Sequence, residues 1–172
     1  MILSGNDSEA PRHSGVGFII TPSVQDSIMS SQLYSNRLAS LKLKAKHGCF
    51  DILSAYVPHN GHDVNLRRDF FSFLLDKVQS LSVNGSKLIY GDLNSILYSR
   101  SALEHEVIGP HLFGDDTISF NADNNRQLLV EVCNALDLYI ANTFFEHPPD
   151  STVTFWAIGG KPFAPISVRS FA

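Results

Sequence analysis

The fold is decided by residues 88–94, which read Leu-Ile-Tyr-Gly-Asp-Leu-Asn. The apolar residues at the start predict a buried strand, and Gly91 predicts the turn that ends it. Asp92 and Asn94 are two residues apart, so we expect both side chains on one face at the end of this strand. There, a carboxylate can activate water while an amide orients a phosphoryl oxygen. Gly-Asp is also a common turn without any catalytic role, so the rest of the chain has to supply the context.

The composition predicts an ordinary globular protein, because the 172 residues are 44% hydrophobic and 17% charged. Residues 1–14 are polar and turn-prone, and we expect a flexible N-terminal segment there, followed by a single domain over residues 15–172. The formal charge of -4 argues against a general basic coat for nucleic acid, although one basic face could still bind phosphates.

The sequence has two cysteines, Cys49 and Cys133, which lie far apart. This favours free thiols over a disulfide and mildly favours a reducing compartment. We find no signal peptide and no apolar run long enough to span a membrane. These observations predict an intracellular protein without membrane contact.

Hydrophobic periodicity predicts layers of α+β or α/β type, with helices covering the faces of a sheet. One face of the strand predicted at 39–47 carries Lys42, Lys44 and Lys46. These lysines fit either a solvated sheet edge or a surface that binds a phosphate backbone. That strand is expected to pair with the next one as a hairpin. The predicted strands lie at 15–22, 39–47, 50–57, 87–90, 138–141 and 152–156, and the helical apolar stripes at 70–81 and 128–136.

Polar groups suited to phosphodiester hydrolysis stand at three predicted strand ends: Tyr56, the pair Asp92 and Asn94, and Asn142. The reaction needs an activated water, donors that stabilise the phosphoryl oxygens, and usually a divalent metal. Asp92 suits the base, and the two asparagines suit the donors. Tyr56 can donate to the phosphate, but it also suits the core near a strand end. Arg67 and the lysines favour a polyanionic substrate.

In this order, the motifs resemble the endonuclease/exonuclease/phosphatase family, whose members are DNase I-like, and most closely its non-LTR retrotransposon endonuclease domains. The resemblance covers roughly residues 14–156. It implies an α+β fold with a two-layer β-sandwich flanked by helices, incomplete at both ends. The matching motifs are Gly15-Val16-Gly17-Phe18, Asn36-Arg37-Leu38, Ser54-Ala55-Tyr56-Val57-Pro58, Gly91-Asp92-Leu93-Asn94, Asn125-Arg126-Gln127-Leu128-Leu129 with residues 138–145, and Thr154-Phe155-Trp156.

By this resemblance, Asp92 activates the attacking water and holds Mg²⁺ or Mn²⁺, Asn94 stabilises the phosphate and Tyr56 contacts it. Asn142 is a looser match, which we expect to bind substrate together with Arg67. The family's Gln-Glu metal motif before the first strand and its Asp and Asp-His motifs after Trp156 are missing from this sequence. A metal held by Asp92 alone is expected to bind weakly.

Three functions remain open at this point. The first is a Mg²⁺-dependent phosphodiester hydrolase, of the retroelement DNA endonuclease type, which would act in the nucleus. The second is an inactive family fragment that serves as a binding module or is a gene remnant, and the third is a phospholipid or inositol phosphatase. No obligate protein partner is evident. The remaining candidates, His59 and His62 in one loop and Glu104, His105 and Glu106 in another, are expected to be solvated.

Overall fold

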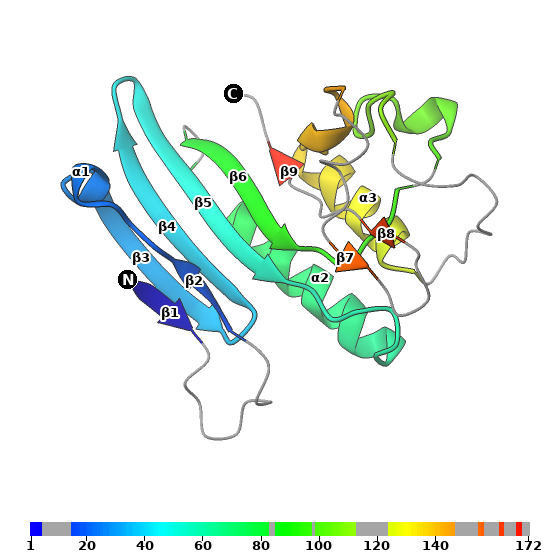
Figure 1. Ribbon diagram of the computed structural model, residues 1–172, viewed down its shortest axis with the longest axis horizontal. Coiled ribbons are helices and arrows are strands. Elements are labelled where there is room, and N and C mark those ends of the chain that lie inside the picture. Colours follow the sequence, from blue (N-terminus) through cyan, green and yellow to red (C-terminus); the bar gives the residue numbers. More distant parts are fainter. Residues whose placement is uncertain are drawn as a thin grey trace.

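A five-stranded sheet in the order β3-β4-β5-β6-β9 forms the centre of the structure (Figure 1). The computed structural model describes residues 1–4, 15–82, 85–97, 99–112, 124–146, 155–156, 162–163 and 168–169. Strands β3 to β5 pair antiparallel, whereas β5 and β6 pair parallel. The bounds of the sheet strands are Ile28–Ser35 for β3, Leu38–Ala45 for β4, Gly48–Tyr56 for β5, Gly85–Asp92 for β6 and Val168–Arg169 for β9.

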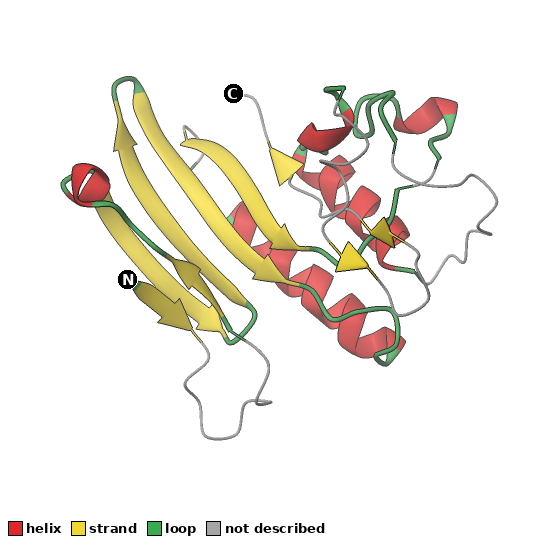
Figure 2. Ribbon diagram, viewed as in Figure 1, coloured by secondary structure: helices red, strands yellow, loops and turns green. Residues whose placement is uncertain are grey.

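Two long helices lie together on one side of the sheet (Figure 2), α2 at Val64–Gln79 and α3 at Asn125–Leu136. Both match the predicted apolar stripes. Their buried faces meet Leu53 and Ile89 from the sheet in the main hydrophobic core. The N-termini are capped by the side chains of Asp63 and Asn124, which accept hydrogen bonds from backbone N–H groups of the first turn. The α+β class is therefore confirmed by a mixed sheet with two helices on one side.

The opposite face of the sheet is covered by a short antiparallel pair, β1 at Ile2–Ser4 and β2 at Val16–Phe18. Val16 and Phe18 pack against Ala39 and Leu41 of β4 in a second core. The first half of β4, Leu38 to Leu41, is thus buried on both faces. The expectation of order only from Gly15 is wrong for residues 2–4, which gain a strand partner; residues 5–14 lie outside the described part of the chain.

The predicted hairpin is confirmed, because β4 and β5 pair over their whole lengths. However, the lysine-bearing strand β4 is not an edge, since β3 pairs along its outer side. Lys44 and Lys46 are exposed, but Lys42 is half-buried and donates to the Ser82 hydroxyl. The solvated-edge interpretation is therefore wrong for the strand as a whole. Strand β3 was not predicted because its polar residues give no alternating pattern.

The remaining elements are short. Within the described part of the chain, Ile140 of the predicted strand 138–141 forms a bridge to Ile108 before a 3-10 turn begins. The two cysteines are free, as predicted. Among the helices described, none combines the length and apolarity needed to cross a membrane. The short elements are α1 Pro22–Gln25, η1 Ala102–Glu104, η2 Ala141–Thr143, β7 Phe155–Trp156 and β8 Pro162–Phe163, of which β7 and β8 pair with each other.

Candidate active site

The parallel pairing of β5 with β6 brings Tyr56 directly beside Asp92 at the ends of the two strands. Just beyond this pair, the Val57 N–H donates to the Asp92 carbonyl at 2.9 Å. The hydrogen bonds between β5 and β6 therefore continue to the last residue of each strand. Carboxyl ends of neighbouring parallel strands form the edge where ligands commonly bind in such sheets. The proximity of Tyr56 and Asp92 along the two strand ends is therefore set by backbone hydrogen bonds.

Gly91 makes this close approach possible. Its φ of 134° lies in a region that only glycine adopts readily. A Cβ atom built there would lie 2.0 Å from the carbonyl oxygen of Ala55 on the neighbouring strand. The glycine thus lets the end of β6 press against β5 immediately before Asp92.

The turn after β6 holds Asp92 and Asn94 together. The Asn94 N–H donates to Asp92 Oδ1 at 3.0 Å, and Asn94 itself has a left-handed φ of 46°. Its Nδ2 donates to the Val57 carbonyl at 2.6 Å, which ties this turn to the segment after β5. An amide nitrogen carries two protons, so one remains for a ligand. Asp92 is exposed and Asn94 half-buried, and both lie at the surface beside Tyr56.

Arg37 adds a fixed positive charge to the same edge. Its guanidinium lies 4.8 Å from the centre of the Tyr56 ring, in cation-π geometry. It also donates to the Tyr56 carbonyl at 3.3 Å, while the Tyr56 N–H donates to the Arg37 carbonyl at 2.9 Å. No separate role was predicted for Arg37, because its contact with Tyr56 depends on how the β3–β4 turn meets the end of β5.

Asn125, the first residue of α3, is the polar centre beneath the site. It is fully buried, and its Nδ2 donates to the carbonyls of Pro58, at 2.8 Å, and Asn94, at 3.1 Å. Its backbone N–H donates to Asn60 Oδ1 at 3.0 Å. Its own Oδ1 accepts from Arg67 at 3.4 Å. One side chain therefore joins the segments that follow β5 and β6 to the start of α3.

Arg67 has a different position from the one expected of a substrate-binding residue. Only 6% of it is exposed, and its guanidinium donates to Asn60 Oδ1, the His62 carbonyl and Asn125 Oδ1. These hydrogen bonds hold the Arg67 guanidinium inside the protein, where it orders the loop of residues 58–62 and is not available to a substrate phosphate. The interpretation as a direct substrate contact is therefore wrong, and Arg67 positions the loop instead.

Asn142 does not join the other three candidates. It lies in η2, which packs against β9, and β9 pairs with Leu88 and Ile89 in the middle of β6. In Figure 1 the orange segment that contains η2 is well separated from the arrowhead of β6. The expected convergence thus holds for Tyr56, Asp92 and Asn94 but is wrong for Asn142.

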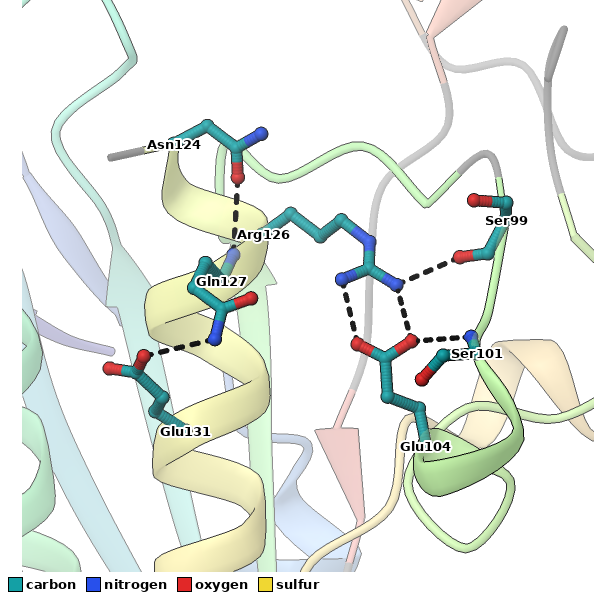
Figure 3. Close-up of polar contacts among 7 residues, drawn as sticks. All are labelled: Ser99, Ser101, Glu104, Asn124, Arg126, Gln127 and Glu131. Atoms are coloured by element: carbon teal, nitrogen blue, oxygen red, sulfur yellow. Dashed lines mark hydrogen bonds and ion pairs between the residues drawn. The ribbon is translucent and has the colours of Figure 1, made fainter. Parts of the chain in front are cut away.

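Arg126, next to Asn125, fixes the loop on the other side of the site (Figure 3). Its guanidinium makes two parallel bonds to the Glu104 carboxylate, at 2.8 and 2.9 Å, and a third to the Ser99 carbonyl at 2.8 Å. Glu104 Oε2 also accepts from the Ser101 N–H at 2.7 Å. The solvated interpretation of Glu104 is therefore wrong, since its side chain is only 15% exposed.

Replacing Glu104 by Gln is expected to lower the free energy of unfolding by about 2 kcal/mol at neutral pH, because the nearly buried Arg126 loses its charged partner. The hydrogen bond from Arg126 holds the pKa of Glu104 below its ordinary value of 4.5, and burial opposes this shift without cancelling it. With the lower pKa in the folded state, the stabilisation is complete above pH 4.5 and is lost as the pH falls through the folded-state pKa.

Urea unfolding of both proteins at neutral and acidic pH measures this difference. The control is Glu106→Gln, since Glu106 is exposed and only approaches His105 at 4.0 Å. A Glu104→Gln variant as stable as the control at neutral pH would show that the ion pair contributes nothing net.

The described residues offer few ligands for a divalent metal at this site. Within the part of the chain that the structure describes, no three His, Cys, Asp or Glu side chains gather where they could hold an ion. Asp92 supplies one exposed carboxylate at the end of β6. That is a partial ligand set, of the kind that Mg²⁺ completes with water and substrate oxygens.

No protein-family model and no curated protein matches the chain. Among solved structures, it is similar to the "Endonuclease domain of TRAS1, a telomere-specific non-LTR retrotransposon", with 12% sequence identity and a TM-score of 0.47. The match covers 82% of this chain and 55% of the other, so the chain spans about half the length of the protein it matches. The function of this chain therefore has to be inferred from the residues of the site.

Proposed function

We propose that the chain is a phosphodiester hydrolase that acts on nucleic acid, with its centre at the joined ends of β5 and β6. The observation that carries this proposal is the pairing of Tyr56 with Asp92, with Arg37 stacked on the tyrosine. An exposed carboxylate, a phenol and a guanidinium at one edge supply a base and donors for a phosphate. The order of motifs along the sequence supports the same reaction.

In this proposal, Asp92 accepts a proton from the water whose oxygen attacks phosphorus. The second proton of the Asn94 amide, the Tyr56 hydroxyl and the Arg37 guanidinium stabilise negative charge on the phosphoryl oxygens. The bond from phosphorus to the leaving oxygen breaks, and that oxygen takes a proton from solvent. Asp92 is held by the bond from the Asn94 N–H to its carboxylate, and the Asn94 amide by the bond from its Nδ2 to the Val57 carbonyl.

Mg²⁺ or Mn²⁺ belongs to the proposal as an ion that Asp92 would hold together with water and substrate oxygens. Such an ion supplies positive charge that offsets the charge on the phosphate. Weak binding is expected from a single carboxylate, so activity should require millimolar rather than micromolar metal and should be lost on chelation.

Asp92→Asn is expected to reduce nicking of supercoiled plasmid by at least about 100-fold, because the base is lost while the shape of the side chain is kept. The matched control is Asp76→Asn, which makes the same change at an exposed position of α2. Both variants are assayed with Mg²⁺ and with chelator, after urea unfolding has shown that they fold. If the wild type and Asp92→Asn nick the plasmid at the same low rate, the chain is a binding module or a gene remnant and not a hydrolase.

The substrate class is tested with the same pair of proteins. Plasmid DNA, single-stranded RNA and an inositol phosphate are offered in parallel, since the same centre can act on several phosphate esters. We expect the Asp92-dependent activity to be highest on DNA, as the retroelement-type motifs imply. Faster release of phosphate from the inositol ester would instead support a phosphatase.

A further inference from the structure

His59 and His62 lie against each other in the loop that follows β5. Their ring centres are 4.2 Å apart and the rings are tilted by 41°. The His62 N–H donates to the His59 carbonyl at 2.9 Å, and the Gly61 N–H donates to His59 Nδ1 at 3.0 Å. In its neutral form His59 therefore carries its proton on Nε2, which leaves a donor on the outer side of an exposed ring.

The loop that carries this pair is fixed from below. Arg67 holds the His62 carbonyl at 3.3 Å, and Arg67 and Asn125 both donate to Asn60 Oδ1. Asn125 also holds the Pro58 carbonyl. Both imidazoles are thus presented by a backbone with several buried hydrogen-bond partners, as expected for a preformed ligand site.

The charges around the pair are predominantly positive. Loss of solvent lowers the pKa of His62, and the charges of His59 and Arg37 lower it further. From α2, Arg67 touches the His62 carbonyl, and Asp63 is the one acidic neighbour in the loop. The Asp63 carboxylate is engaged as the cap of α2, where it accepts from two backbone N–H groups. An anion is the ligand that such surroundings would favour.

We propose that Arg37, His59 and His62 form a phosphate-binding cluster that takes a backbone phosphate of the nucleic acid next to the one that is cleaved. This inference rests on the proposed function, because Arg37 also stacks on Tyr56 at the catalytic centre. Arg37 supplies the permanent charge, His59 its Nε2–H as a donor, and His62, when protonated, a further positive charge in acid. A bound phosphate favours protonation of His62, so binding of nucleic acid tightens as the pH falls.

Binding is measured in the Asp92→Asn background, where turnover is removed, by anisotropy of a short labelled DNA duplex. Affinity is expected to rise at least about fivefold between about pH 8 and about pH 5.5. In the double variant His59→Gln/His62→Gln this rise should disappear. Arg37→Met should weaken binding at both pH values and reduce the slope of log affinity against log salt by about one.

The matched control is His47→Gln/His105→Gln, which removes two exposed histidines outside the cluster. It should keep the full pH dependence. The proposal is overturned if the loop double variant keeps that dependence, or if Arg37→Met binds like its parent at every salt concentration. The proposed function is tested separately, by plasmid nicking with the protein that keeps Asp92. A duplex that binds with normal pH dependence to an enzyme that never nicks would support the cluster and refute the hydrolase.

Discussion

Gly91→Ala is expected to lower the free energy of unfolding by more than about 4 kcal/mol, enough to leave a protein of ordinary stability largely unfolded. Two costs add. The left-handed backbone at φ 134° costs a side chain on the order of 1–3 kcal/mol. In addition, the new methyl group would lie 2.0 Å from the Ala55 carbonyl oxygen, so the backbones of β5 and β6 have to separate. Urea unfolding followed by circular dichroism measures the loss.

Gly48→Ala separates the two costs. Gly48 also has a positive φ, 118°, but it is exposed at the turn between β4 and β5. It should therefore show only the backbone term, on the order of 1–3 kcal/mol. If both variants lose the same free energy of unfolding, the contact between a side chain at position 91 and the Ala55 carbonyl adds nothing to the loss. The two strands would then lie further apart at Gly91 than the structure shows.

Asn125→Ala is expected to destabilise the fold by about 4 kcal/mol. The substitution removes the donors to the Pro58 and Asn94 carbonyls and the acceptor for Arg67, all in a buried region. A buried group left without its partner costs about 1–3 kcal/mol, and these three form one connected network. The variant should also lose nicking activity at temperatures where it is still folded, because the turn that carries Asn94 is no longer held.

The control for this substitution is Asn134→Ala, an exposed position in the last turn of the same helix. It is expected to change stability by less than about 0.5 kcal/mol. Stability is measured by urea unfolding, and nicking is measured at a temperature well below both midpoints. An Asn125→Ala protein with full stability and full activity would contradict the role of this residue as the link between the loops.

Much of the fold follows from local sequence patterns. The two helices and the strands β4, β5 and β6 were predicted because each has a clear period of apolar residues. Strand β3, at Ile28–Ser35, was missed because it is a mostly exposed edge, where polar residues are tolerated on both faces. Strand β1 was missed because Ile2–Ser4 is too short to show a period, and its partner lies beyond a polar stretch.

The site was predicted where one strand end determines it and missed where distant segments meet. Asp92 and Asn94 are neighbours in sequence, and Tyr56 reaches them through the pairing of adjacent strands. Arg37 and Asn125 act through contacts with segments far along the chain, which no local pattern reveals. Arg67 was misjudged for the same reason, since its charge is visible in the sequence but its burial is not.

The register of β5 against β6 also separates the proposed reaction from the choice of substrate. Main-chain bonds make up the pairing of β5 with β6. The histidine loop, in contrast, is attached through the side chains of Arg67 and Asn125, and the segment around Glu104 through the side chain of Arg126. Each of these surface segments can therefore diverge in length and charge as long as its anchoring side chains are kept. The proposed hydrolytic centre is therefore suited to loop grafting, in which the loops that select the substrate are exchanged while the strand ends that carry the reaction stay the same.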